Sequence, residues 1–185
     1  MNTKYEFVPG DEIFIDLGRT VKRIRALVAI AVFGVAPGDL GGYVESVDCL
    51  SSDGNAWVSG NAWVYGNAHV SGNAHVSGNA WVSGNAQVSG NAWVYGDAQV
   101  SGNARVSGDG LIFLASKVGT ENGTLTVCAS ADGGFFVSRG CFEGTVDEFL
   151  EASALKHDSD TQLEYQMLID VAVSRINRAR EKLAA

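Results

Sequence analysis

Two histidines in the middle of the chain, His69 and His75, are the side chains best suited to acid–base chemistry. A histidine acts as a general base when a neighbouring group orients its ring. Both stand at the third position of a six-residue repeat, where Trp and Gln occur in other copies, and the repeat places no acidic residue near them. The sequence therefore favours a non-catalytic role for both histidines.

Other catalytic patterns are absent from the sequence. It contains no GxSxG motif, no P-loop and no GxGxxG turn after a predicted strand. The cysteines, Cys49, Cys128 and Cys141, are odd in number and show no CxxC spacing, so we expect neither a disulfide framework nor structural zinc. Buried, inert thiols are the better interpretation. We expect no cofactor and no metal.

Residues 55–108 form nine copies of the unit (N/D)-A-x-V-(S/Y)-G, with valine at every sixth position from Val58 to Val106. Such strict periodicity is typical of a solenoid, in which each unit buries its apolar side against its neighbours. The x-Val-Ser triplet suits a short strand with valine inward and its neighbours outward. The Gly-Asn pair suits a turn. The repeat therefore predicts a parallel β-helix.

This repeat resembles the hexapeptide motif of left-handed parallel β-helix proteins, in which three units make one triangular coil of 18 residues. The resemblance implies about three regular coils, with residues 18 apart stacked on one face. The three faces then carry Trp57, His75 and Trp93; Trp63, Trp81 and Gln99; and His69, Gln87 and Arg105. Carbonic anhydrases of this fold hold zinc with three histidines, but His69 and His75 would lie on adjacent faces and could not share an ion within one chain.

The flanks carry a second resemblance. "RIRAL" at 23–27, "PGDLGGYVES" at 37–46 and "LSSDGNAWV" at 50–58 are similar to the start of a prophage-encoded, YdcK-like hexapeptide-repeat family. "SKVGTENGTLTV" with "RGCFEGTVDEF" resembles a C-terminal module of phage proteins. We expect a mainly β protein with three parts: an N-terminal β cap over 1–54, the β-helix over 55–118, and a C-terminal hairpin and helical module over 119–185.

Inside the C-terminal module, the alternation of Leu125, Val127 and Ala129 and a turn at Asp132-Gly133 predict a hairpin that returns through 135–139. Capping boxes are predicted at Thr145 with Glu148 and at Ser159 with Gln162. Apolar residues of the last segment alternate steps of four and three, the seam of a coiled coil: Tyr165, Ile169, Ala172, Ile176, Ala179 and Leu183. We assign this seam to self-association, most readily as a homotrimer; a helix packed on its own domain is equally compatible with the spacing.

The net charge of −8 lies mainly in the flanks, because residues 55–108 hold only Asp97 and Arg105 among the charged residues. A nucleic-acid binder would need a basic stripe, so we consider nucleic acid an unlikely partner. The one basic cluster, Arg19 to Arg25, is interpreted as a solvated strand face. The sequence shows no apolar run of membrane-spanning length and no signal pattern, which favours a soluble protein of the host cytosol.

The outward positions of the repeat hold all four tryptophans of the chain and two tyrosines: Trp57, Trp63, Tyr65, Trp81, Trp93 and Tyr95. An uncharged aromatic surface of this kind is normally covered by the protein itself, by sister subunits or by a partner. We therefore predict a non-enzymatic phage-type binding protein, an inhibitor or decoy that acts on a host defence protein or its small signalling ligand. A CoA-dependent acyltransferase of the hexapeptide type and a virion accessory protein are the alternatives.

Overall fold

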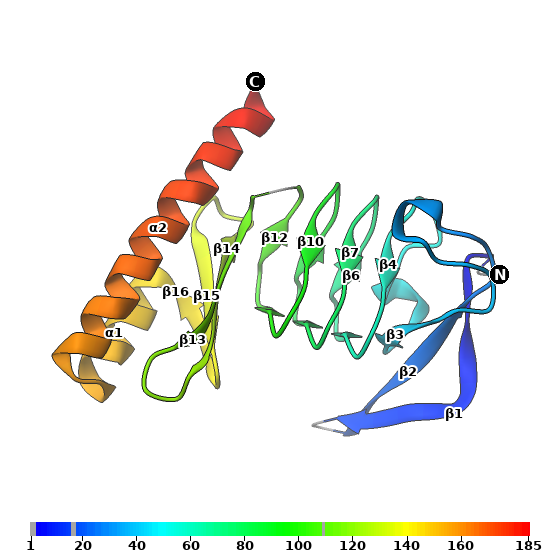
Figure 1. Cartoon of the computed structure of the whole chain (residues 1–185), viewed down its shortest axis with the longest axis horizontal. Coiled ribbons are helices and arrows are strands. Elements are labelled where there is room, and N and C mark those ends of the chain that lie inside the picture. The colour runs from blue at the N-terminus through cyan, green and yellow to red at the C-terminus, as the bar shows by residue number, and fades with distance from the viewer. Residues whose placement is uncertain (1–2, 16–17, 109) are drawn as a thin grey trace.

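The computed structural model describes residues 3–15, 18–108 and 110–185 and has three parts in line (Figure 1). Antiparallel strands lie at the N-terminal end, a parallel β-solenoid forms the middle, and an antiparallel sheet with two helices lies at the C-terminal end. The prediction of a mainly β solenoid with a β cap before it and a hairpin and helices after it is confirmed.

The solenoid is built from two-residue strands, one in each copy of the repeat. They are β4 (Trp57–Val58), β5 (Trp63–Val64), β6 (His69–Val70), β7 (His75–Val76), β8 (Trp81–Val82), β9 (Gln87–Val88), β10 (Trp93–Val94), β11 (Gln99–Val100) and β12 (Arg105–Val106). Each strand pairs in parallel with the strand 18 residues away, such as Trp63 with Trp81. Three faces result, made by β4-β7-β10, β5-β8-β11 and β6-β9-β12. The predicted coil length and face assignments are correct.

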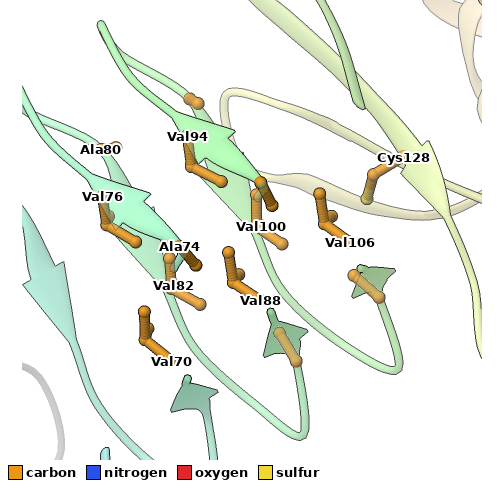
Figure 2. Close-up of a cluster of buried hydrophobic side chains, with 14 of the residues drawn as sticks. Val70, Ala74, Val76, Ala80, Val82, Val88, Val94, Val100, Val106 and Cys128 are labelled. Atoms are coloured by element: carbon orange, nitrogen blue, oxygen red, sulfur yellow. The ribbon is translucent and has the colours of Figure 1, made fainter. Parts of the chain in front are cut away.

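The core of the solenoid consists of the repeated valines and alanines, which are almost completely buried. Figure 2 shows the valines stacked in columns along the interior, with Cys128 of the C-terminal sheet at the end of the stack. At the corners the backbones of successive coils lie close together. A Cβ on Gly54, for example, would lie 2.6 Å from the carbonyl oxygen of Gly72. Glycine is therefore needed at this corner for space as well as for its positive φ of 69°.

Asparagine ladders hold the corners together on the outside. The side-chain amide of one Asn donates to the side-chain oxygen of the residue 18 positions later, as from Asn55 to Asn73 at 2.9 Å. The ladder that contains Asn79 ends at Asp97, a carboxylate that only accepts. These bonds supplement the backbone ladder at positions where the turn exposes polar groups.

At the N-terminal end, β1 (Tyr5–Ile15), β2 (Arg19–Ala26) and β3 (Leu40–Val44) pair antiparallel, and β3 then pairs in parallel with β5. The parallel ladder thus begins inside the segment that the sequence assigned to the cap. The register there is Val44 with Val64, an offset of 20 residues. Two extra residues between Leu50 and Val58, which are eight apart rather than six, hide this first coil from the repeat pattern.

The C-terminal sheet contains β13 (Ile112–Val118), β14 (Gly123–Ala129), β15 (Phe135–Arg139) and β16 (Phe142–Thr145), all antiparallel. The predicted hairpin is its β14–β15 pair. Ile112 and Val118 keep the six-residue spacing, but β13 pairs antiparallel with β14 and does not continue the solenoid to 118 as expected. The reason is local: residues 111–118 contain no Gly-Asn corner, so the chain stays extended.

Two helices complete the module, α1 (Val146–Lys156) and α2 (Ser159–Ala184), and both lie on one side of the C-terminal sheet (Figure 1). The capping box of Thr145 with Glu148 is confirmed. The second box is wrong by one residue, because Asp158 caps α2 through the Thr161 amide at 2.8 Å. In the described part of the chain neither helix is long and apolar enough to cross a membrane.

The seam of α2 packs against its own module. Four of its positions are completely or almost completely buried: Tyr165, Ile169, Ala172 and Ile176. Ala179 is half-buried against the same core, whereas Leu183 is exposed. The assignment of this seam to oligomerisation is therefore wrong for the buried positions, since a helix laid on an apolar sheet needs the same spacing as a coiled coil.

Candidate binding surface

One face of the solenoid carries a column of aromatic side chains. Tyr43, Trp63, Trp81 and Gln99 stand in register on β3, β5, β8 and β11. The indole rings of Trp63 and Trp81 are stacked, with centroids 5.1 Å apart and planes 3° from parallel. Trp63 is half-buried and Trp81 is 40% exposed. We call Tyr43, Trp63 and Trp81 the aromatic ladder.

Arg23 fixes the first rung of the ladder. Its guanidinium lies 4.4 Å from the centroid of the Tyr43 ring and donates to the carbonyl oxygens of Gly41 and Gly60, at 2.8 Å each. The Tyr43 hydroxyl donates to Asp11 at 3.1 Å. Burial raises the pKa of Tyr43 above its usual value, and the carboxylate of Asp11 acts in the same direction while Arg23 opposes it. The hydroxyl is thus held neutral as a donor.

A second face contains Trp57, His75 and Trp93, and the N-terminal cap covers much of it. Trp57 is only 1% exposed, because Gly41 of β3 lies against its ring: a Cβ on Gly41 would come 2.8 Å from the Trp57 Cζ2 atom. Its prediction as an exposed binding residue is therefore wrong: its place on the outside of the first regular coil puts it beneath the cap. Trp93 is 54% exposed and contacts His75 edge to face, with centroids 5.6 Å apart.

The two histidines are engaged by groups of this chain. His75 stacks on Phe33 with centroids 4.4 Å apart, and its Nε2 lies 2.9 Å from the Ser59 hydroxyl. Burial lowers the pKa of His75. His69, on the third face, bonds through Nδ1 to the Asp48 carbonyl oxygen at 2.6 Å. The two rings thus belong to different sheets, and in the described ranges no three His, Cys, Asp or Glu side chains gather as metal ligands.

The six predicted binding residues do not form one surface. Trp63, Trp81 and the half-buried Tyr65 belong to the face of the ladder, whereas Trp93 and Tyr95, which is 56% exposed, belong to the face of β10. Two further aromatic residues were missed. Tyr43 had a usable signal, because Tyr43-Val44 repeats the x-Val pair of the unit. Phe33 had none, since it lies in a short 3-10 turn (Ala31–Phe33) outside the periodic part.

The basic cluster of β2 is neutralised within the N-terminal cap. Its three arginines form ion pairs: Arg19 with Glu45 at 3.2 Å, Arg23 with Asp11 at 3.3 Å and Arg25 with Glu6 at 2.5 Å. Lys22 lies over the Phe7 ring, 5.6 Å from its centroid. The cluster therefore offers an anionic partner less free charge than its composition suggests.

Comparison with known families agrees with this architecture. Residues 68–84, 86–98 and 98–112 match the family described as "YdcK Beta solenoid repeat". A search of curated proteins finds no match to the chain. The matched segments run from β6 to the first residue of β13 and thus cover the regular part of the solenoid without β4 and β5. The middle of this chain is a β-solenoid, and over these segments its repeats are similar to those of the YdcK family.

Proposed function

We propose that this chain is a non-enzymatic binding protein in which the two tryptophans of the aromatic ladder, with Tyr65 beside them, contact a partner protein. The observation that carries the proposal is the stacked pair of Trp63 and Trp81, fixed in register by the backbone and partly open to solvent. Trp and Tyr are the residues that most often dominate protein-binding energy. Because the two rings are already ordered by stacking, little side-chain entropy remains to be lost on binding.

The orientation of the rings favours a protein partner over a planar ligand. The faces of Trp63 and Trp81 lie against each other, so a flat molecule cannot insert between them at their 5.1 Å spacing. Their edges and the face of Trp81 that is turned away from Trp63 remain for contact. An indole edge offers an N–H donor and apolar carbons together, which suits a protein surface of mixed polarity.

The placement of the histidines supports the non-enzymatic part of the proposal. His75 is packed under Phe33, and His69 bonds to a backbone carbonyl rather than to a carboxylate. A general base for acyl transfer needs an accessible ring with an orienting partner. The CoA-dependent acyltransferase remains the alternative to be tested, by a thermal-shift titration with CoA and acetyl-CoA, in which this proposal expects no shift.

The finer parts of the proposal concern origin and partner. The resemblance of the flanks to prophage proteins supports an inhibitor or decoy that acts on a host defence protein in the host cytosol, with a virion accessory role as the other possibility. Self-association as a trimer is also part of it. Trimer formation is supported by the exposed aromatic residues Trp81, Trp93 and Tyr95 and not by the seam of α2, which is buried in its own module.

The test compares the wild-type chain with the double variant Trp63→Ser/Trp81→Ser. Both changes are on the outside and leave the inward valines in place, so circular dichroism should show a folded solenoid. Truncating an aromatic anchor typically costs about 2 kcal/mol of binding, roughly a thirtyfold loss of affinity. Capture from host lysate identifies the partner, and titration of the purified partner then measures the loss.

A matched control is Gln87→Ser/Arg105→Ser, which changes the same repeat position on the third face. The control should bind the partner as the wild type does. Light scattering on all three proteins separates the roles of the ladder: loss of the oligomer makes it a self-interface, and loss of the partner from an intact oligomer makes it the functional surface. If the ladder variant keeps both, the proposal fails.

A further inference from the structure

The C-terminal module contains a cavity of about 410 Å³ that has no place in the proposed function. It lies between the end of β15, the turn into β16 and the two helices. The side chains that matter for its chemistry are Arg139, Phe142, Phe149, Ser153, Lys156 and Tyr165. Its volume is within the range of pockets that bind small organic molecules, about 300–1,000 Å³.

Arg139 is the principal polar group of this cavity. Its side chain is 9% exposed, and one nitrogen, Nη2, donates to the Val118 carbonyl oxygen at 3.0 Å. Nη1 lies 3.8 Å from a carboxylate oxygen of Glu121, too far for a hydrogen bond, and Glu121 is largely exposed. Nε is buried and has no hydrogen-bond partner among the described residues. A guanidinium has five N–H donors, so this buried cation is poorly satisfied.

Packing keeps the guanidinium in place. Gly123 of β14 lies directly beneath it, and a Cβ on that glycine would come within 2.6 Å of the Arg139 Cζ atom. The cation cannot retreat into the sheet, and its bond to Val118 holds one end. Its unused donors are therefore preorganised.

Ser153 of α1 is a second buried polar group with an unmet requirement. The residue lines the same cavity, and its hydroxyl oxygen is buried without a hydrogen-bond partner in the described chain. Buried polar groups are nearly always hydrogen-bonded in native proteins. Two such side chains line one cavity, which favours a ligand with acceptor atoms there.

The charge and the walls of the cavity specify the ligand further. Arg139 and Lys156 contribute two positive charges, against one exposed carboxylate of Glu121. The opposite wall is aromatic. Phe142 and Phe149 meet edge to face at 5.3 Å, and Phe149 meets Tyr165 in the same way at 5.1 Å.

The geometry points to a binding site for a small organic carboxylate with an apolar body. The carboxylate accepts from the unused donors of Arg139 and from the Ser153 hydroxyl, and Lys156 adds attraction from the rim. The apolar body packs on Phe142, Phe149 and Tyr165. A carboxylate fits the single buried guanidinium, because the planar fork of arginine binds two carboxylate oxygens at once. Binding is non-covalent and does not involve Cys141.

The test is a calorimetric titration of the full-length protein with benzoate, benzamide and inorganic phosphate. Benzoate should bind saturably. Benzamide has the same shape without the charge and should bind at least about tenfold more weakly, the equivalent of one charged hydrogen bond. Phosphate as tight as benzoate would overturn the assignment, because the aromatic wall would then contribute nothing. Equal binding of benzoate and benzamide would overturn it as well.

Variants place the binding in this cavity. Arg139→Gln should abolish benzoate binding, and Ser153→Ala and Lys156→Gln should each weaken it several-fold. Ser153→Ala removes an unsatisfied hydroxyl from a helix and should not lower Tm, so a loss of affinity there is not a loss of folding. Lys182→Gln, an exposed change on α2, is the control.

If both Ser153→Ala and Lys156→Gln bind benzoate with unchanged affinity, the proposed site is wrong, even if Arg139→Gln fails to fold. The ladder variant Trp63→Ser/Trp81→Ser should bind benzoate normally, which separates this test from that of the proposed function.

Discussion

The two ends of the solenoid meet the same physical requirement with different chemistry. A stack of parallel coils leaves unpaired backbone groups at its first and last coils, and these groups need hydrogen-bond partners that block further pairing. At the N-terminal end, besides backbone pairing through β3 and the Tyr5 hydroxyl on the Leu50 carbonyl oxygen, the partners include charged side chains. At the C-terminal end the side-chain partners are neutral hydroxyls, besides a backbone bond from Ala131 to Asn103.

The N-terminal end uses cations and a carboxylate. The Lys4 ammonium donates to the Ala56 carbonyl oxygen at 2.8 Å, and Arg23 donates to the Gly60 carbonyl oxygen at the same distance. Glu45 accepts from the Gly66 amide at 2.6 Å. Each of these side chains has one role only, because an ammonium and a guanidinium only donate and a carboxylate only accepts.

The C-terminal end uses β14 and β15 packed across the last coil. The backbone amide of Gln99 donates to the Thr126 hydroxyl at 3.1 Å, and the backbone carbonyl oxygen of Gln99 accepts from the Ser138 hydroxyl at 2.6 Å. A hydroxyl can donate or accept, so it serves either kind of backbone group without the desolvation of a charge. The comparison shows that a solenoid end can be closed with or without ionised groups, and that only the N-terminal closure should depend on the charge of its partners.

The largest expected effect concerns the glycine corners near the two ends. Gly54→Ala would push a Cβ against the Gly72 carbonyl oxygen, whereas Gly96, with a similar positive φ of 67°, has open space around it. We expect Gly96→Ala to lower the free energy of unfolding by about 1–2 kcal/mol for the left-handed backbone alone. Gly54→Ala should lower the free energy of unfolding by about 1–3 kcal/mol more than Gly96→Ala does, because the added Cβ overpacks the contact between coils. Urea denaturation measures both; equal losses would show that the contact between coils does not matter.

A smaller effect is expected from the hydroxyls of the C-terminal end. Ser138→Ala leaves the Gln99 carbonyl oxygen without its donor and should cost about 1–3 kcal/mol. Ser101→Ala is the matched control, because the buried Ser101 hydroxyl has no partner among the described residues and its removal should be neutral or stabilising. Urea denaturation of the two variants should give shifts of opposite sign or clearly different size. A loss of stability in Ser101→Ala as large as that in Ser138→Ala would contradict this account of the end.

The pH dependence should identify the charged end. Burial lowers the pKa of Lys4 to about 8 from 10.5, with the nearby charge of Asp53 acting weakly in the opposite direction. Between these two values the unfolded chain binds more protons at Lys4 than the folded chain. The free energy of unfolding of the wild type, relative to Lys4→Met, should therefore increase as pH rises from 8 toward 10.5. Parallel pH curves for the two proteins in urea denaturation would rule out a desolvated ammonium at this end.

The last prediction concerns the reactivity of the cysteine thiols rather than the stability of the fold. Cys128 closes the core at the C-terminal end, and burial raises the pKa of its thiol to about 12. Cys49 is also buried, whereas Cys141 is exposed. Brief alkylation with iodoacetamide at pH 8 should label Cys141 in the native protein and reach Cys49 and Cys128 only in denaturant. Mass spectrometry of the digested protein measures this, and rapid native labelling of Cys128 would mean that the C-terminal end opens.

The regular part of the fold could be predicted from the sequence because its determinants are local and repeated. Val58 and its eight successors specify the inward side, the Gly-Asn corners specify the turns, and an 18-residue coil then places Trp63 on Trp81. Thr145 with Glu148 likewise specified the start of α1, since a capping box needs only neighbouring residues. The stacked pair of Trp63 and Trp81 follows from these rules, whereas Tyr43 precedes the regular repeat and was missed.

What covers each surface was decided only by the tertiary structure. Trp57 and Trp93 occupy the same position in their units, yet Trp57 is buried under the cap, whereas Trp93 is 54% exposed and is met by the cap only at the edge of the Phe33 ring. The apolar spacing along α2 is the same for a helix that packs on another copy and for one that packs on its own sheet. In this chain the seam is buried against its own module. The cavity at Arg139 likewise brings together groups from both strands and helices. The repeat therefore determined whether each side chain points inward or outward. Which groups cover an outward side chain depended on long-range packing, and a periodic sequence carries no information about that packing.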